Sequence, residues 1–196
     1  LNSIAYSSDG ITWTGVTGST SIFSTGAYGI EWNYMRQNTI TFPANRMVSV
    51  GNGTNSIAYS SDGITWTGVS SSTSIFSSYG YGVAWNGTLW VAVGAGTNTI
   101  AYSSDGINWT GIGTSIFSNA GLGVAWNGTR WVAVGQGTNS IAYSSDGITW
   151  TGVTGTSIFS TSGYGVVWNG TRWVAVGTGT TNTIAYSSDG ITWTGV

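Results

Sequence analysis

The chain has 196 residues, of which only 5% are charged, and its formal net charge is −2. Because soluble domains usually carry about 25% charged residues, we expect a packed protein whose surface is polar but uncharged. Four Arg and no Lys leave no basic stripe for binding phosphates, which argues against a nucleic-acid partner, and the absence of His and Cys argues against zinc sites, copper sites and disulfides.

The first predicted element is a β-hairpin built around the heptapeptide SSDGITW. The heptapeptide occurs at 7–13, 60–66, 144–150 and 187–193, and a fifth copy at 103–109 has Asn108 in place of Thr. Each copy joins two short runs rich in Val, Ile, Tyr, Trp and Thr through an Asp-Gly pair, which is a strong hairpin signal. The chain therefore repeats one structural unit.

The repeat has the length of a propeller blade. Its five Asp residues lie 53, 43, 41 and 43 positions apart, and a four-stranded blade typically takes about 40–50 residues. In the unit 121–153 four strand-like runs follow one another, with turns at Asn127-Gly128 and Asp146-Gly147. Their side chains alternate between a bulky face and a small face, which is what blades stacked face to face require.

We therefore predict an all-β fold, namely a β-propeller of about five blades in a single repeat domain over 1–196. Four four-stranded blades are complete by sequence, and one extra terminal hairpin has no partner hairpin. The predicted boundaries are a hairpin at 1–16 and blades at approximately 27–69, 80–112, 121–153 and 163–196. The chain starts at Leu1 inside a repeat, so we expect a processed chain or a segment of a longer one.

Connectors between the blades contain the tripeptide SIF. It occurs at 21–23, 74–76, 115–117 and 157–159. A recurring Ile-Phe pair in a loop predicts packing into the seam between blades, and a fifth short strand is the alternative interpretation. Helical periodicity is absent along the chain.

The repeat is interrupted once, by the insertion YMRQNTITFPAN at 34–45. Function often lies on such insertions, although hairpin tips also tolerate neutral extensions. The candidate interaction residues of this loop are Tyr34, Met35, Arg36, Phe42 and Pro43.

The hairpin segment Ser7-x-Asp9-Gly10-x-x-Trp13 resembles the Asp-box of the BNR-type repeat, which is found in β-propellers such as sialidases and sortilin-like receptors. That motif usually reads Ser-x-Asp-x-Gly-x-x-Trp, so every copy here is one residue shorter between Asp and Gly. The resemblance implies a structural hairpin on the outside of the propeller, away from the ligand-binding face.

The residues of the motif favour the same role. A carboxylate at a tight turn accepts hydrogen bonds from N–H groups of the turn and from Ser hydroxyls, and Gly adopts a positive φ. The alternative is a calcium or sugar site in each blade, but one carboxylate is a poor calcium site. The predicted structural turn residues are Asp9, Gly10, Trp13, Asp62, Gly63, Trp66, Asp105, Gly106, Trp109, Asp146, Gly147, Trp150, Asp189, Gly190 and Trp193.

Catalysis is not expected, because no catalytic constellation is evident. Sialidase chemistry needs three clustered Arg, a Tyr–Glu pair and an acidic Asp, whereas Arg46, Arg130 and Arg172 share one repeat position and Glu31 is the sole Glu. A glycosidase needs two carboxylates at a set separation. We predict a protein that is not an enzyme, with no metal and no cofactor.

Five Asn-x-Thr sequons could carry N-linked glycans, or could simply be good turn chemistry. They begin at Asn52, Asn86, Asn108, Asn127 and Asn169. All twelve Trp occupy repeated positions, which favours core packing, while a Trp at a hairpin tip could instead stack on a sugar.

The leading functional prediction is a non-catalytic extracellular or surface scaffold that acts in assembly, adhesion or display. Its expected partners are other copies of the chain or a longer parent chain, because an unpaired hairpin edge invites association. The alternative is a lectin with one weak sugar site per blade, acting by avidity. Scarce charge and abundant Ser, Thr, Gly and Asn favour an extracellular, particle-surface or cell-surface location, and no apolar run predicts membrane insertion.

Overall fold

The computed structural model of the chain describes residues 2–32, 46–153 and 158–196. The elements in these ranges are β1 Ala5–Tyr6, β2 Thr14–Gly15, α1 Ser19–Ile22, β3 Gly26–Trp32, β4 Met47–Asn52, β5 Ile57–Ser60, β6 Thr67–Gly68, α2 Ser72–Ile75, β7 Tyr79–Trp85, β8 Trp90–Ala95, β9 Ile100–Ser103, β10 Thr110–Gly111, β11 Ala120–Trp126, β12 Trp131–Gln136, β13 Ile141–Ser144, β14 Thr151–Gly152, β15 Ser162–Trp168, β16 Trp173–Thr178, β17 Ile184–Ser187 and β18 Thr194–Gly195.

Antiparallel pairing joins the strands of each repeat into a four-stranded unit, and we number these units as sheets 1 to 4. Single residue pairs, Ala95 with Ala120 and Gln136 with Ser162, also link sheets 2, 3 and 4 into one twelve-stranded sheet. Strands β3–β6 form sheet 1, β7–β10 sheet 2, β11–β14 sheet 3 and β15–β18 sheet 4, with consecutive strands paired in each. Strands β1 and β2 pair with each other and make the N-terminal hairpin. The predicted all-β fold of repeated antiparallel strands is confirmed.

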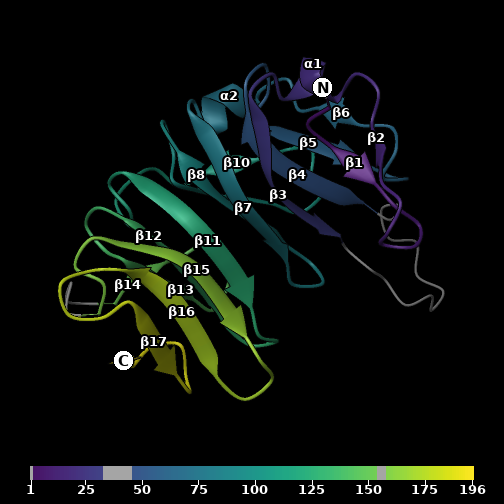
Figure 1. Cartoon of the computed structure of the whole chain (residues 1–196). Helices are drawn as coiled ribbons and strands as arrows, with labels where there is room; N and C mark the ends of the chain where they lie inside the picture. The colour runs from purple at the N-terminus through teal and green to yellow at the C-terminus, as the bar shows by residue number, and fades with distance from the viewer. Residues whose placement is uncertain (1, 33–45, 154–157) are drawn as a thin grey trace.

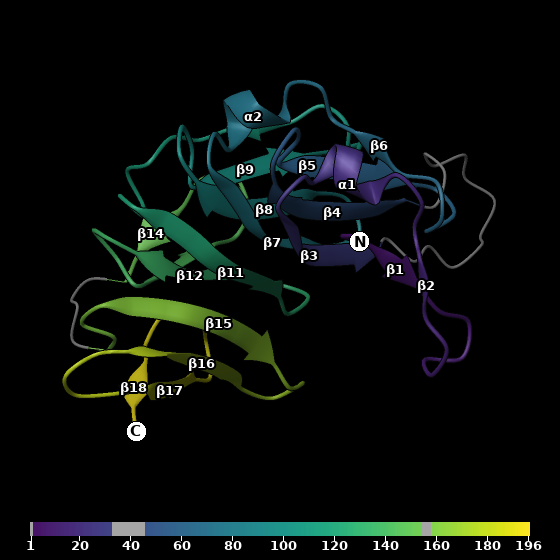
Figure 2. The ribbon, with the colours of Figure 1, turned by 45° about the horizontal axis from the view of Figure 1, so that its top comes forward.

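The sheets follow one another along an arc, and the chain ends lie at different ends of it (Figures 1 and 2). The first strands of the four sheets, β3, β7, β11 and β15, lie side by side. Glycine makes this approach possible, because a Cβ at Gly29 would lie 3.0 Å from the Tyr81 carbonyl oxygen and one at Gly123 would lie 3.2 Å from that of Tyr164. A side chain at Gly29 or Gly123 would therefore require the facing strand to shift by a few tenths of an ångström.

The hydrophobic core lies in the seams between neighbouring sheets. Between sheets 1 and 2, Val50 and Ile57 belong to one buried cluster with Trp90, Ala101 and Trp109. The equivalent side chains form the clusters between sheets 2 and 3 and between sheets 3 and 4. Each seam thus joins the valines and isoleucine of one sheet to the tryptophans and alanines of the next.

The first two connectors differ from the sequence-based prediction, whereas the third, at 112–119, is a loop as expected. Residues 19–22 and 72–75 form single helical turns, α1 and α2, rather than a loop or a fifth strand. The N–H of Phe23 donates to the Ser19 carbonyl at 3.0 Å, so an i to i−4 bond closes the turn. The predicted packing in the seams is confirmed, since Ile75 and Phe76 lie in the cluster between sheets 1 and 2.

The Asn-Gly pairs form hairpins as predicted, but only Gly has a positive φ and the loop has four residues, 86–89, between the paired Trp85 and Trp90. Asn86 Oδ1 accepts the N–H groups of Thr88 at 2.8 Å and Leu89 at 2.6 Å, while Gly87 has φ 104°. The insertion at 34–45, with Tyr34, Met35, Arg36, Phe42 and Pro43, lies outside the described residues. In the described ranges, no helix is long and apolar enough to cross a membrane.

Candidate functional site

Each SSDG segment forms the turn between the last two strands of its sheet or of the N-terminal hairpin. In sheet 3, Asp146 Oδ1 accepts the N–H groups of Ile148 at 2.8 Å and Thr149 at 2.7 Å, and the Ser144 hydroxyl at 2.9 Å. The Ser144 oxygen in turn accepts the N–H groups of Asp146 and Gly147. The same hydrogen bonds occur at Asp9, Asp62, Asp105 and Asp189.

These hydrogen bonds favour the ionised carboxylate. At Asp62, the backbone N–H groups of Thr65 and Ile64 lower the pKa from 3.8 to about 2. At Asp105 burial is the largest influence and raises the pKa, but the N–H groups of Asn108 and Ile107 and the Asn108 side chain together outweigh it, so the pKa is also about 2. Such a group stays charged at neutral pH and has little tendency to transfer a proton.

Gly and Trp complete the turn. The five turn glycines have φ between 72° and 77°, a left-handed conformation that other residues adopt at a cost. The indole N–H groups of Trp66, Trp150 and Trp193 donate to the carbonyl of the turn Gly at 3.0–3.2 Å. In sheets 1, 3 and 4 this hydrogen bond holds the last strand against the turn that precedes it, whereas the indole nitrogen of Trp109 in sheet 2 is buried without a hydrogen-bond partner.

The basic side chains are dispersed over the sheets. Arg46, Arg130 and Arg172 each stack on the Tyr of their own sheet at 4.9–5.4 Å from the ring centroid, and Arg46 Nη1 also donates to the Asp105 carbonyl. Among the described residues, no group of three or more His, Cys, Asp or Glu side chains could hold a metal ion. The three arginines that the structure describes thus lie on three different sheets.

The N-terminal hairpin shows what happens to the repeat without a preceding sheet. Residues 2–16, 55–69 and 139–153 have identical sequences. Trp66 and Trp150 are each 8% exposed, but Trp13 is 63% exposed, and Ala5 is exposed where Ala58 and Ala142 are buried. The difference comes from the neighbours alone, because the sequence is the same. We call Ala5 and Trp13 the N-terminal face.

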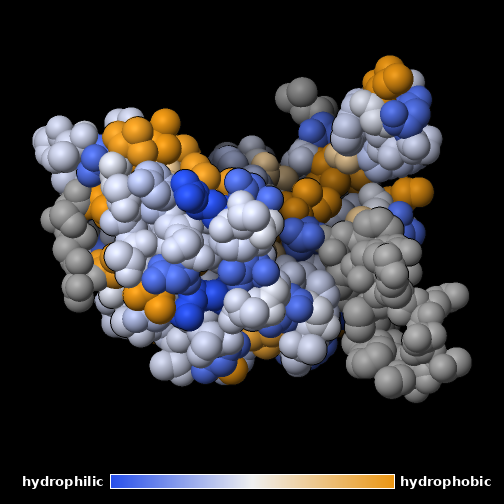
Figure 3. Space-filling model, turned by 90° about the horizontal axis from the view of Figure 1, so that it is seen from below, coloured by the Kyte–Doolittle hydropathy of each residue, from blue (hydrophilic) through white to orange (hydrophobic). Residues whose placement is uncertain are grey.

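Sheet 4 shows the complementary situation at the other end of the arc. Val176 is 45% exposed and Ile184 46%, whereas the residues at the same positions in the other three sheets are 0–1% exposed. Val196 is exposed as well. We call Val176, Ile184 and Val196 the C-terminal face, and Figure 3 shows apolar residues exposed among polar ones on this side of the molecule.

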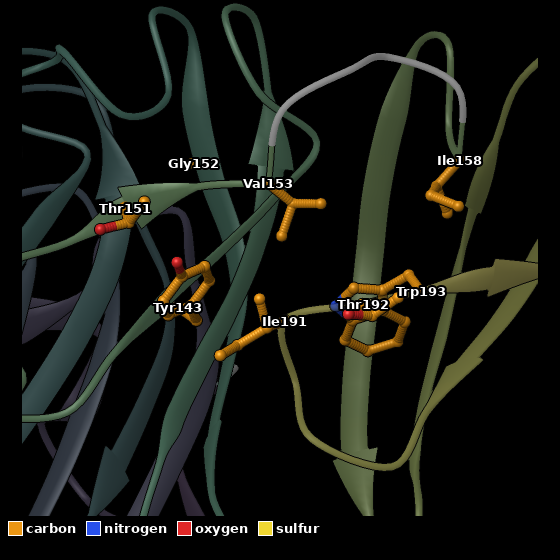
Figure 4. Close-up of a pocket in the computed structure, with 8 residues that line it drawn as sticks. All are labelled: Tyr143, Thr151, Gly152, Val153, Ile158, Ile191, Thr192 and Trp193. Carbon is orange, nitrogen blue, oxygen red and sulfur yellow. The ribbon is translucent and has the colours of Figure 1, made fainter.

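Two surface pockets lie between neighbouring units of the repeat. The larger, about 360 Å³, lies between sheets 3 and 4 and is lined by Tyr143, Trp193 and the hydroxyl-bearing Thr151 and Thr192 among others (Figure 4). The second, about 270 Å³, lies between the N-terminal hairpin and sheet 1. Its lining residues are Ser3, Ile4, Ala5, Ala27, Tyr28, Gly29, Ile30 and Ser49.

The sequons lie at the ends of strands and in turns. Asn86, Asn127 and Asn169 each accept the backbone N–H groups of the two residues at the end of their turn. Asn108 is exposed beside the Asp105 turn, and Asn52 ends β4. The side-chain oxygens of Asn86, Asn127 and Asn169 thus accept backbone N–H groups in the first hairpin of a sheet, as the Asp carboxylates do in the second.

Comparisons with known proteins bear on the fold. No family model and no curated protein matches the chain. It is similar to a chain of a nidogen/laminin complex (TM-score 0.64, 11% identity, covering 90% of this chain and 64% of that one) and to the computationally designed Ika8 protein (0.54, 13%, 84% and 46%). It is also similar to a GH74 enzyme of Niastella koreensis (0.54, 18%, 87% and 24%).

These likenesses support a propeller-like arrangement of the sheets. The chain spans less than two thirds of the length of each of these three structures. At 11–18% identity they indicate the fold alone.

Proposed function

We infer that the chain is a non-catalytic, extracellular or surface scaffold of the Asp-box kind, with about five blades, that acts by assembling with other copies or within a longer parent chain. The observation that carries this is the C-terminal face. Val176 and Ile184 occupy positions that are fully buried in sheets 1–3, yet here they are nearly half exposed.

The N-terminal face has the matching chemistry. In the seam between sheets 3 and 4, Val134 and Ile141 share a cluster with Ala185 and Trp193. Val176 and Ile184 correspond to the first pair, and Ala5 and Trp13 to the second. A contact between the C-terminal face of one copy and the N-terminal face of the next would therefore repeat the part of an internal seam that the third and fourth strands contribute. Such a heterologous contact forms rings if it closes and filaments if it does not.

The scaffold function is tested by the mass of the chain in solution. Wild type should exceed the monomer mass of 20.3 kDa in sedimentation equilibrium as its concentration rises. Val176→Asp should remain a monomer, because a buried unpaired charge would oppose the contact. Ser188→Asp is the matched control, since it adds the same charge at an exposed turn position of sheet 4. A monomeric wild type at every concentration would count against assembly.

A lectin is the second candidate, and the pocket between sheets 3 and 4 favours it. An aromatic wall with neighbouring hydroxyls suits a sugar ring, and Tyr143, Trp193, Thr151 and Thr192 provide both. Binding on a glycan array that is lost in Tyr143→Ala would support this function. Failure to bind any glycan would leave the scaffold as the only proposal.

A further inference from the structure

The open edge of the N-terminal hairpin points to a second binding surface, which shares Ala5 with the N-terminal face. In each of the four sheets, the third strand pairs on one side with the fourth strand and on the other with the second. Strand β1 has the sequence and place of a third strand, but within the described residues it pairs only with β2. Its other edge presents unpaired backbone groups, which is a template for a further strand.

We propose that this edge and the adjoining pocket bind a β-hairpin with the sequence of the first two strands of the repeat. The pocket of about 270 Å³, lined by Ser3–Ala5 on one side and by Ala27–Ile30 and Ser49 on the other, is the binding surface. We call it the slot.

The internal copies identify the occupant. Residues 139–153 have the same sequence as residues 2–16, and the segment 120–138 precedes them. That segment forms β11 and β12, and β12 pairs with β13 through Val132–Tyr143, Ala133–Ala142 and Val134–Ile141. Applied to β1, this register sets Val132 opposite Tyr6, Ala133 opposite Ala5 and Val134 opposite Ile4.

The exposure of Ile30 indicates the second contact of the occupant. Val83, at the same position in sheet 2, is 8% exposed because Val50 and Val48 of the preceding sheet cover that side. Ile30 is 57% exposed. The valines of the bound hairpin would cover Ile30 as Val48 and Val50 cover Val83. The hairpin would therefore be held both by backbone pairing with β1 and by apolar contact with β3.

One residue of the slot departs from the repeat and gives the proposal a sharper test. Sheets 2–4 have Gly80, Gly121 and Gly163 where sheet 1 has Ala27, and a Cβ added to any of these glycines would lie 2.7–2.8 Å from a valine Cβ of the preceding sheet. The Ala27 methyl group therefore opposes close approach of Val134 of the occupant. Ala27→Gly removes this obstacle and should tighten binding.

A synthetic peptide of residues 120–138 is the probe. Because the chain has no Cys, Ile30→Cys introduces a single thiol in the slot, and Val167→Cys, at a position 60% exposed on sheet 4, is the control. At a peptide concentration of ten times Kd, alkylation of Cys at position 30 should slow about tenfold while that at position 167 is unchanged. A peptide carrying Val132→Pro and Ala133→Pro should have no effect, because proline cannot donate to the ladder.

Several outcomes would overturn the proposal. They are an unchanged alkylation rate at position 30, protection at position 167 instead, equal protection by the proline peptide, and binding by Ala27→Gly that is no tighter than by wild type. Ile30→Asp should abolish binding of the fluorescently labelled peptide and leave the circular dichroism of the free chain unchanged, since Ile30 is exposed. Full binding by this variant would also contradict the slot.

Discussion

Gly10 and Gly147 occupy the same place in identical segments and have similar φ values, 72° and 77°. Their surroundings differ. A Cβ at Gly10 would meet nothing within 4 Å, whereas one at Gly147 would lie 2.8 Å from Leu89 Cδ2 and 3.0 Å from Trp131 Nε1. The two glycines therefore separate the cost of backbone conformation from the cost of packing against the preceding sheet.

Gly147→Ala should lower the free energy of unfolding more than Gly10→Ala does. Gly10→Ala pays only for a left-handed alanine, about 1 kcal/mol, while Gly147→Ala adds overpacking and should cost about 2–4 kcal/mol. Urea denaturation followed by circular dichroism measures both. Equal losses in the two variants would mean that the turn of sheet 3 does not pack against sheet 2 as described.

The turn carboxylates should make stability depend on acid pH. The pKa of Asp62 is lowered to about 2 by the N–H groups of Thr65 and Ile64, while an unfolded Asp has a pKa of about 3.9. The stabilisation is therefore present above about pH 4 and is lost as pH falls toward 2. The midpoint of thermal unfolding should fall over this interval, and Asp62→Asn should reduce the fall. A midpoint that is constant between pH 4 and 2 would contradict this role.

At the scale of the elements, the sequence predicted the strands well because alternation and turn residues are local signals. The Asp-Gly and Asn-Gly hairpins followed from residues such as Asp146 and Asn127. The helical turns α1 and α2 were missed, since Ser-Thr-Ser-Ile has no helical period over four residues and the turn forms as Ile22 and Phe23 enter the seam. Nor could a repeated motif reveal that Trp13 and Trp66 differ in exposure, because that depends on the neighbouring sheet.

Equivalent positions in different sheets should respond differently to truncation. Ile141 is 1% exposed in the seam between sheets 3 and 4, and Ile184 is the same residue of the repeat on the open side of sheet 4. Ile141→Ala should cost about 2–5 kcal/mol of unfolding free energy, whereas Ile184→Ala should cost less than about 1 kcal/mol. Comparable losses from the two substitutions in dilute chain would show that sheet 4 is already covered.

At the scale of the whole molecule, the described chain is an arc of four sheets with two unlike ends. One end offers Val176 and Ile184, and the other offers Ala5 and Trp13 on a hairpin that lacks two of its strands. In the internal seams, residues at the same positions as Val176 and Ile184 pack against residues at the same positions as Ala5 and Trp13. These seams therefore indicate how the two ends of the arc would contact each other. The sequence predicted the unmatched hairpin from a count of motifs, but the apolar face of sheet 4 became evident only from burial.

The head-to-tail contact between copies is tested most directly by disulfide trapping. Chains carrying Ala5→Cys are mixed with chains carrying Ile184→Cys and oxidised, since the wild type has no Cys of its own. Ile141 and Ala185 share a buried cluster in the equivalent internal seam, so a mixed disulfide dimer should form in preference to either homodimer. Absence of the mixed dimer, or homodimers in equal yield, would contradict assembly through these two faces.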